Sequence, residues 1–496
     1  MQSEQKPVFL LKASYILTSA NDPIIVNGSL VWQAGTILSV GDSATLSEQY
    51  PDAKIIDCNG QIVLPGLINA HDHGRGIGTL AMGVPDDALE VWLNGLFSMR
   101  PVDCYLSALY DGLNLLRSGV TTTVHQHNPR DWSNIEEELR ESARGYRDAG
   151  IRASIGLPLI DQNLLYYLGD QVFLNSLPAY LAAPLKKMGM AGPKVDWQAV
   201  LDISVRLQKA WSTDSFTWYH WAPVGVQWCS DELLLGIKQA AGHSPIQIHL
   251  LETRYQQAYG QKAFDSTMVA HLAGLGFLDE NVSCAHGVWL TDADIQIIAE
   301  HRAMVVHNPS SNLRLRSGVC RVLDLMDASV RVAIGLDGAT LSDDQDMFVE
   351  MRLAKALALE PGVNERSLSP RQILGMATLN AAEVVAGPGP IRGMLKSGAA
   401  ADLIALRVDR IVSPYVDDRT DILDVVFRRA KTDDIDTVIV NGEIQMRAGR
   451  HLRQEVNAVE TALNVSLAFA KSPEQIAQEQ MAGDLRPYIK AIYSHW

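Results

Sequence analysis

Apolar runs recur eight times through the middle of the chain, and each is followed by a polar loop and a stretch with helical spacing. The runs are GLINA, GVTTTVHQH, IRASIGLPLI, SFTWYHWAP, PIQIHLL, VSCAHGVWL, AMVVHNPSS and VRVAIGLDG. Short, nearly continuous apolar runs are typical of parallel strands that are buried on both faces. Between the first two runs, Leu106, Leu109, Leu113 and Leu116 share one helical face, and Gly119 ends the pattern. Eight such strands alternating with helices predict an α/β fold, a TIM-type (β/α)₈ barrel over residues 65–389.

The two ends of the chain have a different pattern, with short alternating runs separated by turn signals. The dipeptides Asn27-Gly28 and Asn441-Gly442 are typical of hairpin turns. We predict that residues 1–64 and 390–452 together form a small composite β-sandwich domain. Residues 453–496 are expected to form a helical extension, packed either on the barrel or at a subunit interface. Residues 161–214, between the third and fourth strands, are expected to cap the pocket.

Composition narrows the choice of partner. The chain has 496 residues, 47% of them apolar, and a formal charge of −15. Nucleic acid and anionic membranes would repel such a chain, so we expect neither as a partner. No apolar run approaches the roughly 18–20 residues of a membrane helix, and a lysine interrupts the N-terminal run VFLLKASYIL. The sequence therefore predicts a cytoplasmic enzyme, and a homo-oligomer is compatible with it.

Potential metal ligands stand at the ends of three predicted strands. His71 and His73 follow the first strand, His249 lies in the fifth, and Asp337 follows the eighth. The carboxyl ends of barrel strands meet at one face, where barrel active sites are built. Three imidazoles and one carboxylate are a suitable ligand set for a divalent transition metal. With one position left for water, such a centre is a hydrolytic catalyst.

A single His-x-His pair is weak evidence for a metal site. With 13 histidines in the chain, chance alone provides roughly a third of one such pair. The second strand carries another pair, His125 and His127, and residues two apart on a strand face the same way. Either pair can therefore face the barrel interior, whereas an isolated pair is more often hydrogen-bonded packing at a strand end.

Five segments, spaced along the chain like the predicted strands, support a metal-binding role for His71 and His73. They are LPGLINAHDH, IHLLET, CAHGVWL, VVHNPSSNLRLRSG and IGLDGA, and near the end IRGMLKSGAAADLIAL follows. The chain resembles the amidohydrolase superfamily, in particular its aminohydrolase branch of cytosine, guanine and adenosine-type deaminases and triazine hydrolases. The resemblance implies that His71, His73, His249 and Asp337 bind the metal and that Asp337 also takes a proton from the water. It further implies that Glu252 shuttles a proton and that His286 orients the water or the substrate.

The chain departs from the family pattern at the fourth strand. Many relatives have a substrate-contacting histidine where Val224 stands here, which predicts that unmodified adenosine-like substrates are poor. Other polar or aromatic residues near the strand ends are candidate substrate contacts, with surface or structural roles as the alternative. These candidates are Arg75, His125, His127, His220, Trp228 and His307.

The fourth strand also bears on the number of metals. Binuclear relatives use a carbamylated lysine at its end, and SFTWYHWAP contains no lysine. We therefore expect one metal per chain, with zinc (Zn²⁺) as the default and iron(II) (Fe²⁺) possible by ligand type.

Together these residues predict a metal-dependent hydrolase that acts on non-peptide C–N bonds. The expected reaction is deamination of a small amino-substituted N-heterocycle, of purine, pteridine, pyrimidine or triazine type, with release of ammonia. The same site would also serve cyclic-amide hydrolysis or hydrolytic dechlorination. A non-catalytic scaffold is the alternative from another class, although such proteins usually lose ligands that are all present here.

Overall fold

Two four-stranded parallel sheets form the centre of the molecule. The computed structural model describes residues 6–187, 196–338 and 340–496. One sheet has the order β5 (Leu67–Asn69), β6 (Val120–Gln126), β7 (Arg152–Gly156) and β9 (Thr217–Tyr219). The other has the order β11 (Ile246–Leu250), β12 (Val282–His286), β13 (Met304–His307) and β14 (Arg331–Ile334). Each of the eight predicted runs contains one of these strands, so the mixed α/β fold with parallel strands is confirmed.

Backbone hydrogen bonds join the two sheets at both edges. The amide of Ala70, just after β5, donates to the carbonyl of Ile334 in β14 at 3.0 Å. At the opposite edge, Trp221 forms a parallel bridge with Ile246, and the amide of Gln247 donates to the Trp221 carbonyl at 2.8 Å. All residues of β6, β7, β11, β12 and β13 are buried, as expected for strands covered on both faces. A short pair, β8 (Pro158–Leu159) and β10 (Ala222–Pro223), lies beyond β7 and β9.

Helices follow the central strands and cover them. The helix α3 has the predicted apolar face, and its first turn is capped by Asp103, whose carboxylate accepts from the Leu106 amide at 2.8 Å. In chain order, the helices are α2 (Leu89–Leu96), α3 (Cys104–Arg117), α4 (Ile135–Ala149), α5 (Asp170–Ser176), α6 (Ala179–Lys187), α7 (Trp197–Ala210), α8 (Asp231–Ala241), α9 (Arg254–Phe264), α10 (Met268–Gly274) and α11 (Asp292–Glu300). They are followed by α12 (Pro309–Arg314), α13 (Val322–Asp327), α14 (Met347–Leu357), α15 (Pro370–Met376) and α16 (Leu379–Val384).

The two ends of the chain build one sheet, as predicted. Its eight strands have the order β18 (Arg450–His451), β17 (Glu443–Arg447), β16 (Ile435–Val440), β15 (Leu403–Arg407), β4 (Lys54–Pro65), β1 (Val8–Leu17), β2 (Ile24–Gln33) and β3 (Thr36–Asp42). The helices α1 (Ser43–Gln49), α17 (Val408–Val412) and α18 (Ile422–Arg429) accompany it. The two chain ends meet where β4 pairs with β15. The sheet is continuous and curls, which brings β2 close to the turn after β16: the Trp32 indole donates to the Gly442 carbonyl at 3.0 Å.

One of the two predicted hairpin turns is wrong. Asn441 and Gly442 form the two-residue turn between β16 and β17, both with positive φ. Asn27 and Gly28 instead lie inside β2, where Asn27 adopts a positive φ without reversing the chain. The reversal between β2 and β3 uses Ala34-Gly35, both with positive φ. The pairing of β2 with β1 on one side and β3 on the other keeps the strand extended through Asn27.

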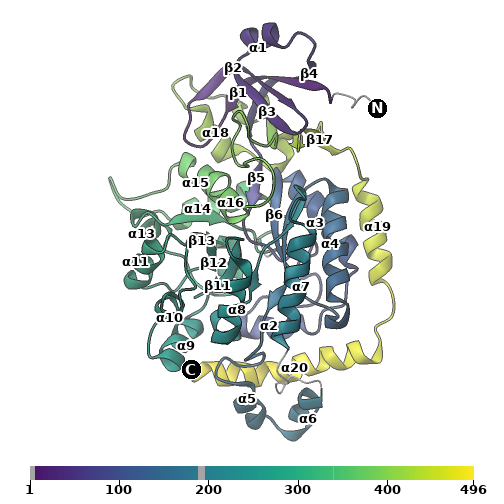
Figure 1. Cartoon of the computed structure of the whole chain (residues 1–496), viewed down its shortest axis with the longest axis vertical. Helices are drawn as coiled ribbons and strands as arrows, with labels where there is room; N and C mark the ends of the chain where they lie inside the picture. The colour runs from purple at the N-terminus through teal and green to yellow at the C-terminus, as the bar shows by residue number, and fades with distance from the viewer. Residues whose placement is uncertain (1–5, 188–195, 339) are drawn as a thin grey trace.

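The C-terminal extension packs on the central fold. It contains α19 (Val456–Leu467), beside α3, and α20 (Pro473–Ser494), beside α2. In Figure 1, the yellow helix α20 crosses the end of the molecule opposite the composite sheet, close to α2, α5 and α6. Because β4 leads directly into β5, the amino ends of the central strands face the composite sheet and their carboxyl ends face α20. In the described part of the chain, no helix combines the length and apolar character that a membrane crossing requires.

Candidate metal centre

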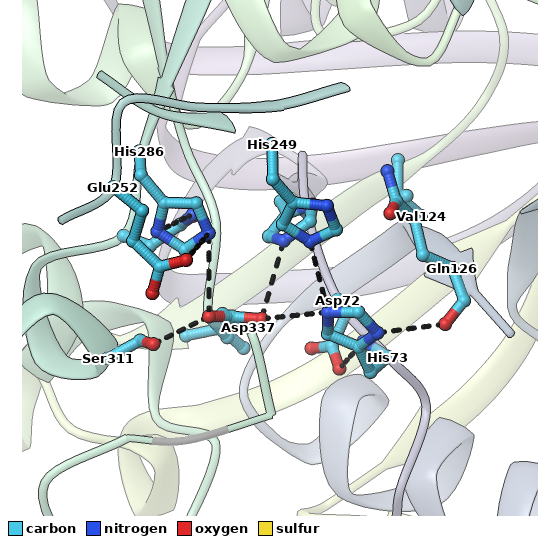
Figure 2. A network of polar contacts seen from close by, with 12 residues as sticks. Asp72, His73, Val124, Gln126, His249, Glu252, His286, Ser311 and Asp337 are labelled. Carbon is cyan, nitrogen blue, oxygen red and sulfur yellow. Dashed lines mark hydrogen bonds and ion pairs between the residues drawn. The ribbon is translucent and has the colours of Figure 1, made fainter. Parts of the chain in front are cut away.

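Four side chains converge at the carboxyl ends of the central strands (Figure 2). Asp337 Oδ1 lies 3.3 Å from His71 Nε2 and 3.3 Å from His73 Nε2. His249 Nε2 lies 3.4 Å from His73 Nε2. Ligands at 2.0–2.1 Å from a tetrahedral zinc ion are separated by about 3.3–3.4 Å, so these spacings fit the edges of such a site. The four residues predicted as ligands are therefore brought together.

The other nitrogen of each imidazole fixes the direction of the ring. Each Nδ1 faces a carbonyl oxygen, which assigns the proton to Nδ1 and leaves the Nε2 lone pair free for a metal. The pairs are His71 with Gln247 Oε1 at 2.7 Å, His73 with the Gln126 carbonyl at 3.0 Å, and His249 with the Val224 carbonyl at 2.6 Å. The buried Nε2 of His71 has no hydrogen-bond partner. This donor set fits a divalent transition metal.

The position of Asp337 depends on an uncommon backbone conformation. Its φ is 57°, in the left-handed region, and its amide donates to the His71 carbonyl at 2.9 Å. Its second carboxylate oxygen, Oδ2, accepts from Ser311 Oγ at 2.6 Å. Although burial opposes ionisation, His71, His286 and His73 hold the pKa of Asp337 well below its usual range. Asp337 is thus an ionised carboxylate with one oxygen, Oδ1, beside the Nε2 atoms of His71 and His73.

Glu252 and His286 lie on the other side of Asp337. Glu252 Oε2 is 3.8 Å from His286 Nε2, which is 4.0 Å from Asp337 Oδ2. Burial, together with the nearby carboxylates of Asp337 and Glu90, raises the pKa of Glu252 well above its usual range. Burial lowers the pKa of His286 to about 4. The site therefore combines a carboxyl group whose pKa is raised with an imidazole whose pKa is lowered, which are a potential acid and a potential base in proton-transfer chemistry.

The second histidine pair faces other partners than the four convergent ligands. His125 Nδ1 lies 2.9 Å from the Tyr146 hydroxyl, and His125 Nε2 lies 3.1 Å from His127 Nδ1. His127 Nε2 completes the chain with Glu138 Oε2 at 2.8 Å. Cys104, His127 and Glu138 also bring three donor atoms within 4.8 Å of one another. Because both nitrogens of His127 already have protein partners, this geometry favours hydrogen-bonded packing for the pair.

The remaining candidates have varied surroundings. Arg75 lies beside the centre, with Nη1 3.5 Å from the Asp337 carbonyl and its guanidinium 5.2 Å from the Trp92 ring. His220 is buried against Ser154, 3.1 Å from its hydroxyl. Trp228 packs edge-on against Tyr167. Both ring nitrogens of His307 are buried without a hydrogen-bond partner, and burial lowers its pKa to about 3.

Two features of the site could not be predicted from the sequence. Val224 contributes its backbone carbonyl, which orients His249, so its side chain is not the part that touches the centre. Glu90, on α2, is a buried carboxylate whose Oε1 accepts from Thr253 at 2.6 Å and from Tyr167 at 3.1 Å. Burial raises the pKa of Glu90. A glutamate inside the apolar run LEVWL was the only available hint.

Fold and site together define a metal-dependent hydrolase of the kind built at the carboxyl ends of parallel strands. A model of the amidohydrolase family matches residues 62–445, so the chain belongs to this family and the predicted membership is confirmed. It is 29% identical over 447 residues to a 5-methylthioadenosine/S-adenosylhomocysteine deaminase from Thermococcus sibiricus, covering 88% of this chain and 93% of the relative.

Solved structures support the same fold. An adenosine deaminase from Xanthomonas campestris with bound zinc is 23% identical, with a TM-score of 0.73 over 93% of this chain and 98% of that one. An atrazine chlorohydrolase from Arthrobacter aurescens in complex with zinc is 21% identical, with a TM-score of 0.77 over 92% and 99%. The predicted aminohydrolase branch therefore agrees with both the relative and these folds.

Proposed function

We propose that this chain is a metal-dependent aminohydrolase that removes the amino group of an adenine-type nucleoside or a related amino-substituted N-heterocycle. One observation carries the proposal: four ligand-type side chains converge beside the buried carboxyl of Glu252, whose pKa is raised by burial. The names of the relatives, which include deaminases of adenine-type nucleosides, agree with this chemistry.

We propose the finer architecture on the same basis. The two parallel sheets, hydrogen-bonded at both edges, are interpreted as one (β/α)₈ barrel over residues 65–389. The curled sheet of residues 1–64 and 390–452 is interpreted as a composite β-sandwich, with residues 453–496 as the helical extension. The boundaries between these three units are placed where the sequence pattern changes.

The proposed cofactor is a single zinc ion held by His71, His73, His249 and Asp337. Bound there, the metal would lower the pKa of a coordinated water and so supply a nucleophile at neutral pH. The fourth strand, β9, is followed by His220 and Trp221 and offers no lysine for a bridge to a second ion. Zinc suits the mixture of imidazole and carboxylate donors, and iron(II) is the alternative that elemental analysis would reveal.

The protein side chains are then assigned as follows. Asp337 accepts the proton of the attacking water, since its carboxylate is ionised and adjoins the ligand imidazoles. Glu252 donates a proton to a ring nitrogen, which makes the neighbouring carbon electrophilic. His286 lies between the two carboxylates and accepts a hydrogen bond from the incoming water. Asp337 then passes the water proton to the amine, which leaves as ammonia, while the hydroxyl proton goes to Glu252 and a carbonyl oxygen remains on the ring.

An ammonia-release screen on the zinc-loaded enzyme tests the proposal. Adenosine, 5′-deoxyadenosine and 5′-methylthioadenosine would be compared with guanine, cytosine, pterin and an aminotriazine, and the Glu252→Gln variant would provide the background rate. Turnover of at least one amino-heterocycle, dependent on Glu252, is expected. Release of chloride from a chlorotriazine, or ring opening of a cyclic amide, without ammonia from any amine would overturn the deaminase assignment.

A further inference from the structure

A groove of about 450 Å³ opens beside the metal centre. It lies between the loop after β5, the end of α2, the segment after β6 and the start of α20. Its walls include Arg75, Phe97, Met99, Asn128, Arg130 and Gln478. This volume is in the range of pockets that hold small heterocyclic ligands.

The groove continues inward to a metal ligand. A smaller hollow of about 30 Å³ shares Arg75, Asn128 and Arg130 with the groove and is lined on its inner side by His73. The side chains common to both hollows therefore line the way from the outer groove to His73. A molecule lying in the groove with one end toward His73 would pass both arginines.

Neither arginine forms a direct ion pair in the part of the chain that the structure describes, although the carboxylates of Asp337, Asp72 and Asp111 act on Arg75 at longer range. Among the described residues, no carboxylate oxygen lies within 4.0 Å of the guanidinium nitrogens of Arg75 or Arg130, although the chain as a whole carries a charge of −15. The third arginine of the groove, Arg100, is already used, because it donates to the carbonyls of Leu467 and Phe469. Glu474 is the acidic residue of the lining, at the start of α20.

We propose that Arg75 and Arg130 form a subsite for an anionic group, a carboxylate or a phosphate, carried by the heterocyclic substrate. A guanidinium presents a planar fork of donors that matches the two oxygens of either group. Arg75 is fixed for this role by the Trp92 ring beneath it and by the Asp337 carbonyl. The inference rests on the proposed function and adds to it that the preferred substrates are anionic.

Binding of paired ligands to the zinc-loaded enzyme tests the subsite without turnover. Each pair shares a ring that has already lost its amine and differs by one anionic group: inosine with inosine 5′-monophosphate, and lumazine with lumazine-6-carboxylate. Calorimetry is expected to find the anionic member of at least one pair bound about tenfold or more tightly. The variants Arg75→Gln and Arg130→Gln should each remove most of this preference, and Arg130→Gln should leave the affinity for the neutral member unchanged.

Matched variants separate the subsite from general effects. Arg140→Gln, on the exposed face of α4 where Arg140 pairs with Glu136, should keep the wild-type preference. Arg130→Lys should keep part of it, because the charge remains while the fork is lost. Melting temperatures identify any variant that fails to fold, and Arg130 is exposed, so its substitution should be tolerated.

The outcomes distinguish the two proposals. Equal binding of neutral and anionic ligands by the wild-type enzyme, or equal weakening of both by the arginine substitutions, overturns the subsite even if ammonia is released from neutral substrates. An anion preference that depends on Arg75 and Arg130 supports the subsite even if no amine is hydrolysed, in which case the deaminase proposal alone fails.

Discussion

The carboxyl groups of Glu252 and Asp337 flank the same imidazole, but their surroundings shift their pKa values in opposite directions. His286 Nε2 lies 3.8 Å from one and 4.0 Å from the other. The pKa of Asp337 is held well below its usual range, whereas burial raises that of Glu252 well above it. Two carboxyl groups with divergent pKa values are the arrangement from which an acid and a base can be assigned. Asp337 is thus the base in the proposed reaction and Glu252 the acid.

Glu252→Gln should therefore abolish proton donation with little change in shape. Turnover is expected to fall by roughly 10²–10⁴, while metal content and melting temperature stay near those of the wild type. Steady-state kinetics and elemental analysis on the same preparation provide the measurement. Near-normal turnover by this variant would show that Glu252 is not the acid.

Substitutions in the two histidine pairs should differ in their effect on the metal. His71→Asn removes a donor whose Nε2 faces Asp337, so the metal content should fall well below one per chain. His125→Gln alters only the chain through Tyr146 and His127 and should leave one metal bound. Chelation of the wild type should also lower its melting temperature, since a ligand that binds only the folded state stabilises it. If His125→Gln loses the metal and His71→Asn retains it, the metal is bound by the pair His125 and His127, and the prediction is wrong.

The strands and the ligand residues could be predicted because their signals are local. Parallel strands covered on both faces require apolar runs, and a histidine near the carboxyl end of such a run, like His249 in β11, is recognisable as a potential ligand. The pairing of β4 with β15 joins the two chain ends. It could be expected only because both segments have the same pattern of short alternating runs. The position of α20 at the carboxyl ends of the strands depends on long-range contacts, such as that of Asn94 with the Ala482 carbonyl, and left no sequence signal.

The predictions that were wrong concern residues whose conformation or role depends on contacts with other parts of the chain. Asn27-Gly28 has the composition of a turn, but pairing with both neighbouring strands decides its conformation. Val224 was judged by its side chain, whereas its backbone carbonyl is what contacts His249. A backbone contact is independent of residue type, so the sequence contains no trace of it.

A buried ion pair links the central fold to the composite sheet. Arg152 of β7 donates to both oxygens of Asp402, at 2.9 and 3.2 Å, and neither side chain is exposed. Arg152→Met should destabilise the protein by roughly 3–5 kcal/mol, because it leaves a buried carboxylate without its partner. The double variant Arg152→Met/Asp402→Asn removes that charge and should recover part of the melting temperature. If the double variant melts lower than the single one, the isolated charge is not the cause of the loss.

Glu350 should make stability depend on pH in the opposite sense to a carboxylate whose pKa is lowered by folding. It is fully buried on α14, where its carboxyl oxygens face the amide and hydroxyl of Ser310, and burial raises its pKa from 4.5 to about 7. The folded state therefore binds a proton that the unfolded state releases between these pH values. The resulting stabilisation is complete below about pH 4.5 and is lost as pH rises through about 7.

Glu350→Gln replaces the ionisable group with a neutral amide of similar shape, so the melting temperature should fall less between pH 5 and pH 8 than in the wild type. Thermal unfolding of the metal-loaded protein at both pH values provides the measurement. Glu136→Gln is the matched control, because the pKa of the partly exposed Glu136 is lowered by Arg140 and the residue stays ionised throughout this range. Wild type and Glu136→Gln should therefore share one pH dependence. If Glu350→Gln follows it as well, with parallel curves for all three proteins, Glu350 does not take up a proton on folding.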